Sequence, residues 1–183
     1  MNIRTWEKMA LEGQYWKDWY AKAAEQIKTI CTKNGWDCGE FIDILSLTSP
    51  RVHVKRNLRI ALHYFREGSL PSTVWKPFVT SVEHYESTGE IRGPKTSAFA
   101  DALKGNTDAV VLDVWMAAAF NVEQKVFSKK TEREKYETII RRVAKRLGWE
   151  PRQVQAAMWA SAVKQHGRNV PAYNIAEELT LWD

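Results

Sequence analysis

Cysteine and long apolar runs are both scarce in this chain. Only two of its 183 residues are cysteines, Cys31 and Cys38. They could pair with each other, but they are too few for a disulfide framework or for a four-cysteine zinc or iron–sulfur site. No stretch approaches the roughly 18 apolar residues of a membrane-spanning helix. The first residues also lack the apolar core of a secretion signal, so we expect a cytoplasmic protein without a membrane partner.

Common catalytic motifs are missing as well. The four histidines are His53, His63, His84 and His166, and no pair of them has metal-ligand spacing together with a carboxylate. The chain contains neither a Walker phosphate loop nor a dinucleotide fingerprint. We therefore expect no metal and no cofactor, which excludes zinc hydrolases and nucleotide-dependent dehydrogenases.

Positive charge is what the sequence does have, and it is concentrated in one block. The chain carries a net charge of +5, and residues 125–152 hold ten Lys/Arg against four Asp/Glu. Such a block is typical of contact with a polyanion. It is equally typical of a solvated helix face, because Glu132, Glu134 and Glu137 are interleaved with the cations. Nine tryptophans could pack in a core or stack on bases.

Apolar residues recur at three- and four-residue spacing through most of the chain, which predicts an all-α fold. With 44% hydrophobic residues, the chain can bury a core. We find no alternation with a period of two. Helices are expected over residues 13–33, 37–45, 50–67, 71–86, 94–104, 114–120, 131–147 and 151–166, with a short segment from Pro171 to Trp182.

Capping residues set several of these boundaries. Asp37 and Glu40 have the spacing of a capping box, and Ser49 followed by Pro50 is typical of an N-cap and a first helical position. Asp113 should cap the helix that begins at residue 114. These capping residues predict the first residues of three helices.

Two residues suggest chemistry. Lys95 lies in Gly93-Pro94-Lys95-Thr96, a turn that opens a helix, and Asp113 follows eighteen residues later, after an apolar run over residues 109–112. The helix macrodipole and partial burial both disfavour a charged lysine, so we expect the pKa of Lys95 below its usual value of about 10.4. Burial should raise the pKa of Asp113, and a nearby Lys95 should oppose this. An amine and a carboxylate at two helix starts could converge on one anomeric carbon.

The segment from about residue 75 to residue 120 resembles the helix-hairpin-helix DNA glycosylase superfamily, the endonuclease III-like enzymes. That family carries a hairpin of the form L-P-G-V-G-x-K-T and an essential aspartate after a gap of the same size. The matching residues here are Gly93, Lys95, Thr96 and Asp113. Ile91 stands where the first hairpin glycine belongs, and Gly89 is expected to compensate by a shifted turn. The resemblance covers about residues 40–165.

The resemblance implies a two-lobed fold with a central cleft and double-stranded DNA with a flipped or modified base as partner. The expected lobes are residues 37–107 and residues 1–36 with 108–183. Lys95 would be the nucleophile and Asp113 the base and electrostatic stabiliser, without the iron–sulfur cluster of many relatives. The expected DNA-binding residues, on the hairpin and on an early helix start, are Arg92, Gly93, Thr96, Ser49, Arg51 and Lys55.

The expected activity is that of an N-glycosylase, with AP-lyase activity if Lys95 forms a Schiff base. Two alternatives stay open. The chain could modify DNA bases without cutting the strand, as bacteriophage relatives of this family do, in which case it would act in the host cytoplasm. It could also be a DNA-binding or inhibitor module that retains the scaffold without catalysis.

Overall fold

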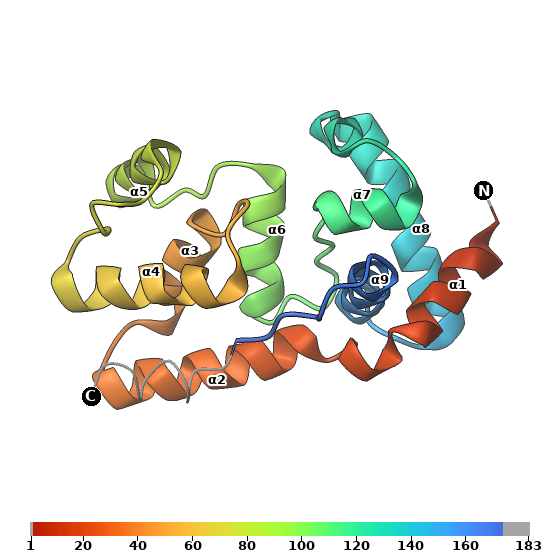
Figure 1. The fold of residues 1–183 in the computed structure, drawn as a ribbon, viewed down its shortest axis with the longest axis horizontal. Helices are drawn as coiled ribbons and strands as arrows, with labels where there is room; N and C mark the ends of the chain where they lie inside the picture. The colour runs from red at the N-terminus through yellow and green to blue at the C-terminus, as the bar shows by residue number, and fades with distance from the viewer. Residues whose placement is uncertain (1, 174–183) are drawn as a thin grey trace. The chain divides into compact units, whose positions relative to one another are not determined.

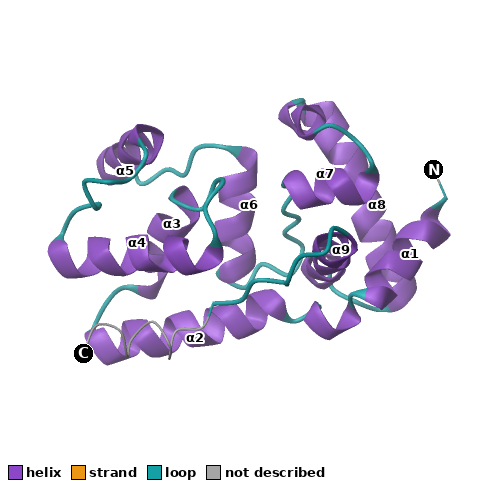
Figure 2. Cartoon of the chain, in the orientation of Figure 1, coloured by secondary structure: helices purple, strands orange, loops and turns teal. Residues whose placement is uncertain are grey.

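The computed structural model describes residues 2–173, and within that range the chain forms helices joined by loops and turns, with no strand (Figure 2). The expected all-α class is therefore confirmed for the described chain. The longer helices are α1 (Ile3–Glu12), α2 (Trp19–Asn34), α3 (Cys38–Leu47), α4 (Val54–Glu67), α5 (Lys76–Thr88), α6 (Pro94–Leu103), α7 (Val114–Phe120), α8 (Lys130–Leu147) and α9 (Pro151–Gln165). Two short 3-10 helices are η1 (Gln14–Trp16) and η2 (Gln124–Ser128).

The chain divides into two compact units. Unit 1 comprises residues 1–21 and 105–170, and unit 2 comprises residues 22–104 and 171–183. The expected lobe boundary was at residue 36, whereas this division assigns residues 22–36 to the same unit as α3–α6. The reason is local: Trp36 stacks on Phe41 of α3 at 6.0 Å and lies 5.4 Å from the ring of Phe65 in α4. Helix α2 begins in unit 1 and continues into unit 2.

Unit 1 is built around α9, which packs against α1, α7 and α8 (Figure 1). Almost the whole circumference of α9 is buried, and many of its residues are alanines, so neighbouring helices can approach closely. Gly13, at the end of α1, shows how closely: a β-carbon there would lie 1.9 Å from the carbonyl oxygen of Ala157. The core of this unit is completed by the rings of Trp6, Phe120 and Tyr136.

The N-terminal helix was not expected from the sequence. The prediction began a single helix at residue 13, but Gly13 ends α1 and the chain continues through η1 before α2 starts at Trp19. The signal for α1 was present in the sequence. Asn2 caps the helix by accepting from the amide of Arg4, and Trp6, Met9 and Ala10 follow at helical spacing and are buried.

Unit 2 is organised around α3, which packs against α4, α5 and α6. Every residue from Phe41 to Leu47 is buried. Helix α4 is amphipathic and turns Leu58 and its apolar neighbours inward. Asp37 caps α3 by accepting from the amide of Glu40 at 2.7 Å, as the capping spacing predicted.

The predicted start of α4 was wrong. Ser49 does not cap it, because the Ser49 hydroxyl donates instead to the carbonyl of Ser46 at the end of α3, at 2.8 Å. Helix α4 begins at Val54, and the ring of His53 accepts from the amide of Lys55. Between the two helices, the amide of Val52 donates to the carbonyl of Ser49, closing a tight turn.

A buried polar cluster joins this turn to the rest of unit 2. The side-chain amide of Asn57 donates to the carbonyl of Leu45 and to the hydroxyl of Thr48, both at 2.9 Å. Its oxygen accepts from the hydroxyl of Tyr173, also at 2.9 Å. Asn57 is only 1% exposed, so these bonds satisfy a polar group that has no access to water. The expected segment beyond Pro171 otherwise lies outside the described residues.

Helices α6 to α9 agree with the predicted boundaries to within one residue, whereas α5 begins at Lys76, five residues after the predicted start. Pro94 and Pro151 each occupy the first position of a helix, as expected from the fixed φ of proline. Between residues 2 and 173, no helix combines the length and the apolar character that a membrane crossing requires.

Candidate functional site

Helices α5 and α6 are joined by a turn, called the hairpin below, that lacks the residue pattern of the family motif. The two helices pack on α3 and are not among the pairs that pack closely against each other. Gly89 ends α5 with a φ of 72°, and Gly93 precedes α6 with a φ of 96°. Ile91, which replaces the expected hairpin glycine, is not among the residues with positive φ. The two glycines thus supply the left-handed conformations that an isoleucine does not readily adopt. The compensation expected of Gly89 stays a prediction, because a left-handed glycine ends many helices.

Lys95 is the second residue of α6 and is half-buried. Gly93 has no side chain with which to cap the helix, and Pro94 has no amide hydrogen. The positive end of the α6 macrodipole is therefore not neutralised by a side-chain cap at this turn. Thr96 is buried, whereas Arg92 and Gly93 are exposed. The arrangement suits an anion approaching the hairpin, since a helix start and an exposed arginine lie together.

Asp113 is the N-cap of α7. Its Oδ1 atom accepts from the amides of Trp115 and Met116, both at 3.0 Å. The apolar run before it, residues 109–112, is buried and extended, which fixes the chain at this point. The prediction that Asp113 caps this helix is therefore confirmed. Both capping bonds use the same carboxylate oxygen.

Lys95 belongs to unit 2 and Asp113 belongs to unit 1. Each is held at the start of a short helix by its own local structure: the Gly93-Pro94 turn for the lysine, and the capping bonds for the aspartate. The sequence spacing of eighteen residues therefore spans the change from one unit to the other.

The other expected DNA-binding residues lie around the turn between α3 and α4. Arg51 is exposed and has a φ of 61°, a conformation that costs a residue with a side chain about 1 kcal/mol or more. Ser49 and Lys55 are half-buried on either side of it. The strained turn persists because the bonds of Thr48 and Asn57 hold the chain beneath it.

Asp43 ties both helices of the hairpin to α3 and was not identified from the sequence. Its Oδ2 accepts from the hydroxyl of Tyr85 in α5 at 2.8 Å, and its Oδ1 pairs with the amine of Lys104, at the end of α6, at 2.6 Å. Burial, followed by the hydrogen bond to Asp43, raises the pKa of Tyr85 above its usual value. The signal available in the sequence was an aspartate in the middle of an otherwise apolar helix. In the structure Asp43 is only 7% exposed, and a buried charge requires partners.

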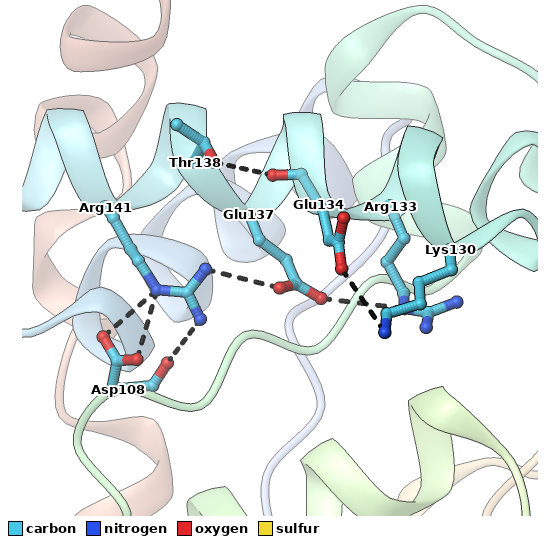
Figure 3. A network of polar contacts seen from close by, with 7 residues as sticks. All are labelled: Asp108, Lys130, Arg133, Glu134, Glu137, Thr138 and Arg141. Carbon is cyan, nitrogen blue, oxygen red and sulfur yellow. Dashed lines mark hydrogen bonds and ion pairs between the residues drawn. The ribbon is translucent and has the colours of Figure 1, made fainter.

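The basic block of residues 125–152 is largely a helix face of alternating charges (Figure 3). On α8, Glu137 lies between Arg133 at 3.7 Å and Arg141 at 3.3 Å, and Arg141 also reaches both carboxylate oxygens of Asp108 at 3.2 Å. These pairs agree with the solvated-face interpretation of the block. Among the lysines and arginines of this block, all of which the structure describes, Lys129, Arg142 and Lys145 form no ion pair.

The two cysteines are free thiols in unit 2. Burial, followed by the proximity of Cys38, raises the pKa of Cys31 to about 12. A buried thiol with a raised pKa is a poor nucleophile and a poor metal ligand at neutral pH. Residues 2–173 contain no group of three or more His, Cys, Asp and Glu side chains arranged to hold a metal ion.

A family model matches most of the chain. It covers residues 3–166 and is described as a family of unknown function, DUF7178. No curated protein and no solved structure matches the chain. The matched range contains Lys95, Asp113, the α5–α6 hairpin and the turn at Arg51. The chain therefore belongs to the DUF7178 family.

Proposed function

We propose that this protein binds duplex DNA and acts at the sugar of one nucleotide as a glycosylase, with Lys95 as nucleophile and Asp113 as electrostatic stabiliser. The observation that carries the proposal is the start of α6. A lysine lies in the first turn of a helix that has no side-chain cap, directly after a glycine-closed hairpin. The resemblance of this segment to the helix-hairpin-helix DNA glycosylases supports the same assignment.

The chemistry assigns a separate role to each residue. Positive charge develops on the deoxyribose as the bond from C1′ to the base breaks, and a carboxylate stabilises that charge. The lysine amine forms a bond to C1′ while the base leaves with the electron pair of the broken bond. Loss of a proton from the amine and opening of the sugar ring then give a Schiff base, which permits β-elimination of the 3′ phosphate. The proposal requires that both side chains act on the same nucleotide.

The hairpin and the Arg51 turn would provide the contacts to the DNA backbone. Arg92 and the start of α6 suit a phosphate, and Arg51 is exposed on a tight turn. The base would be turned out of the stack, because atoms at C1′ are not accessible within a duplex. Contacts of this kind predict an affinity that falls steeply with salt concentration.

The direct test is reduction of a Schiff base. The protein would be incubated with duplexes that contain damaged, modified or abasic nucleotides, and sodium borohydride would be added to trap a covalent adduct. We expect an adduct with the wild-type protein and none with Lys95→Ala. Lys76→Ala is a matched control, because Lys76 is an exposed lysine at the first position of α5, the other helix of the hairpin. It should form as much adduct as the wild type.

Asp113→Asn separates the charge from the cap. Asparagine caps a helix about as well as aspartate, so the free energy of unfolding should change by less than about 1 kcal/mol. Adduct formation should be lost. Asp113→Ala should lose both activity and about 1 kcal/mol. An adduct that persists in Lys95→Ala would contradict the assignment of the nucleophile. DNA binding without any adduct would favour a binding module, and altered nucleosides without abasic sites would favour base modification.

A further inference from the structure

The end of α9 holds an arginine in a defined position. The amide of Gly167 donates to the carbonyl of Lys164 at 2.9 Å, and the amide of Arg168 donates to the carbonyl of Val163 at 3.2 Å. With His166 as the C-cap and Gly167 at a φ of 69°, this is the Schellman motif. The residue in the place of Arg168 normally makes a hydrophobic contact in that motif. Here the place is taken by a cation.

The guanidinium of Arg168 lies over the ring of Trp115. Its central carbon is 5.4 Å from the ring centroid, and the ring of His166 meets the same tryptophan edge-on at 5.5 Å. Trp115 is itself fixed, because its amide donates to Oδ1 of Asp113 and its half-buried ring packs against the core of unit 1. All of these groups belong to unit 1. Arg168 is therefore held next to the residues that follow the proposed catalytic aspartate.

Arg168 differs from the arginines of α8 in its charge environment. Arg133 and Arg141 are neutralised by Glu137 and Asp108, whereas Arg168 is exposed and, among the described residues, has no carboxylate partner. A guanidinium in a cation–π contact with an aromatic ring keeps its N–H donors available to a further ligand. Those donors match two oxygens of a phosphate.

We propose that Arg168, oriented by Trp115, binds a backbone phosphate of the DNA close to the nucleotide at Asp113. This inference rests on the DNA-binding part of the proposed function. We choose a phosphodiester as the ligand because the exposed guanidinium has no carboxylate partner among the described residues, and an uncompensated positive charge favours an anion. It also gives Trp115 a role besides core packing: its ring limits the orientations of the guanidinium before the DNA arrives.

The test is the salt dependence of binding to a fluorescently labelled duplex of arbitrary sequence. For Arg168→Ala we expect roughly tenfold weaker binding near physiological salt and a slope of log K against log salt that is smaller by about one. Arg168→Lys should keep most of the slope but lose part of the affinity, since lysine lacks the planar fork. Arg142→Ala is the matched control, an exposed arginine of α8 without an ion pair, and should bind as the wild type does.

The outcomes separate this inference from the proposed function. Equal affinity and slope for Arg168→Ala and the wild type would overturn the assignment of Arg168, and so would an equal loss in Arg142→Ala. A wild-type protein that does not bind duplex DNA even at about 50 mM salt would overturn both proposals. Loss of binding in Arg168→Ala without borohydride trapping in the wild type would leave this inference standing and overturn the assignment of Lys95 as nucleophile.

Discussion

The two units of the protein solve the problem of a small helical core differently. Unit 1 packs small residues on the central helix α9 against its neighbours and places its charges on the surface, where α8 carries a series of ion pairs (Figure 3). Unit 2 buries more of its polar side chains and joins several of them by hydrogen bonds and an ion pair centred on Asn57 and Asp43, although the buried hydroxyl of Ser46 has no partner in the described chain. The first arrangement depends on shape, and the second depends on polar contacts within the core.

The difference has consequences for the candidate site. In unit 2, the Asn57 cluster holds the strained turn at Arg51, and Asp43 joins the two helices of the hairpin that carries Lys95. A buried side chain whose polar atoms all have partners fixes one arrangement of the chain around it, so we expect Asn57 to hold the Arg51 turn rigidly. In unit 1, Asp113 is positioned by a helix cap and a buried apolar run, which are local features.

The largest expected effect is in the packing of unit 1. Gly13→Ala would place a β-carbon 1.9 Å from the Ala157 carbonyl oxygen, so α1 and α9 would have to separate. We expect a loss of more than about 3 kcal/mol in the free energy of unfolding, measured by chemical denaturation. Gly89→Ala in unit 2 is the control. No atom lies within 4 Å of its β-carbon position, so only the left-handed φ of 72° is penalised, by about 1 kcal/mol. Equal losses would refute the contrast.

A somewhat smaller loss should follow from opening the polar cluster of unit 2. Asn57→Ala leaves the carbonyl of Leu45 and the hydroxyl of Tyr173 without the partners shown here. Because these groups are buried, we expect a loss of about 3 kcal/mol in unfolding free energy and faster hydrogen exchange at residues 48–53. Gln155→Ala in unit 1 removes one buried bond, from the hydroxyl of Tyr20, and should cost about 1 to 2 kcal/mol. A larger loss for Gln155→Ala would reverse the comparison.

Alkaline pH should destabilise unit 2 before unit 1. Burial is the first cause of the raised pKa values of Cys31, Tyr64, Tyr85 and Tyr173, all of which lie in unit 2. Above about pH 9 the unfolded chain begins to release protons that the native state retains. Stability therefore falls as pH rises, and most steeply for the two fully buried groups, Cys31 and Tyr173.

For Cys31 this contribution is fully present below pH 9 and is lost as the pH approaches about 12. Limited proteolysis at pH 10.5, with the fragments identified by mass spectrometry, should show cleavage within residues 22–104 before residues 105–170. Cys31→Ala should make the stability of the protein depend less on pH in this range. Cleavage that starts in unit 1 would be inconsistent with the expected order.

The smallest effect concerns the surface of unit 1. Glu137→Gln removes a partner from Arg133 and Arg141 and should cost about 0.5 kcal/mol at low salt. Because salt screens exposed charges, the difference from the wild type should largely disappear at 1 M NaCl in urea denaturation. Glu134→Gln, which loses only the longer contact with Lys130 at 3.9 Å, serves as the matched control and should change stability less.

Local sequence signals fixed several elements correctly. Asp37 caps α3, Pro94 and Pro151 start α6 and α9, and Asp113 caps α7, because each of these devices operates within one helical turn. The same kind of reasoning failed at Ser49. Its hydroxyl had two possible partners, and it donates back to the carbonyl of Ser46 in the preceding helix. Nothing in the local sequence favours one partner over the other.

The sequence alone determined the helical class, most helix starts and the positions of Lys95 and Asp113 in the first turn and at the N-cap of their helices, because spacing and capping act over only a few residues. Tertiary structure decided which helices share a core, that Asp43 joins α3 to the hairpin, that Asn57 supports the Arg51 turn, and that Arg168 lies on Trp115. Those contacts join residues far apart in the chain. Their formation depends on how whole helices pack, which no pattern within a single helix records.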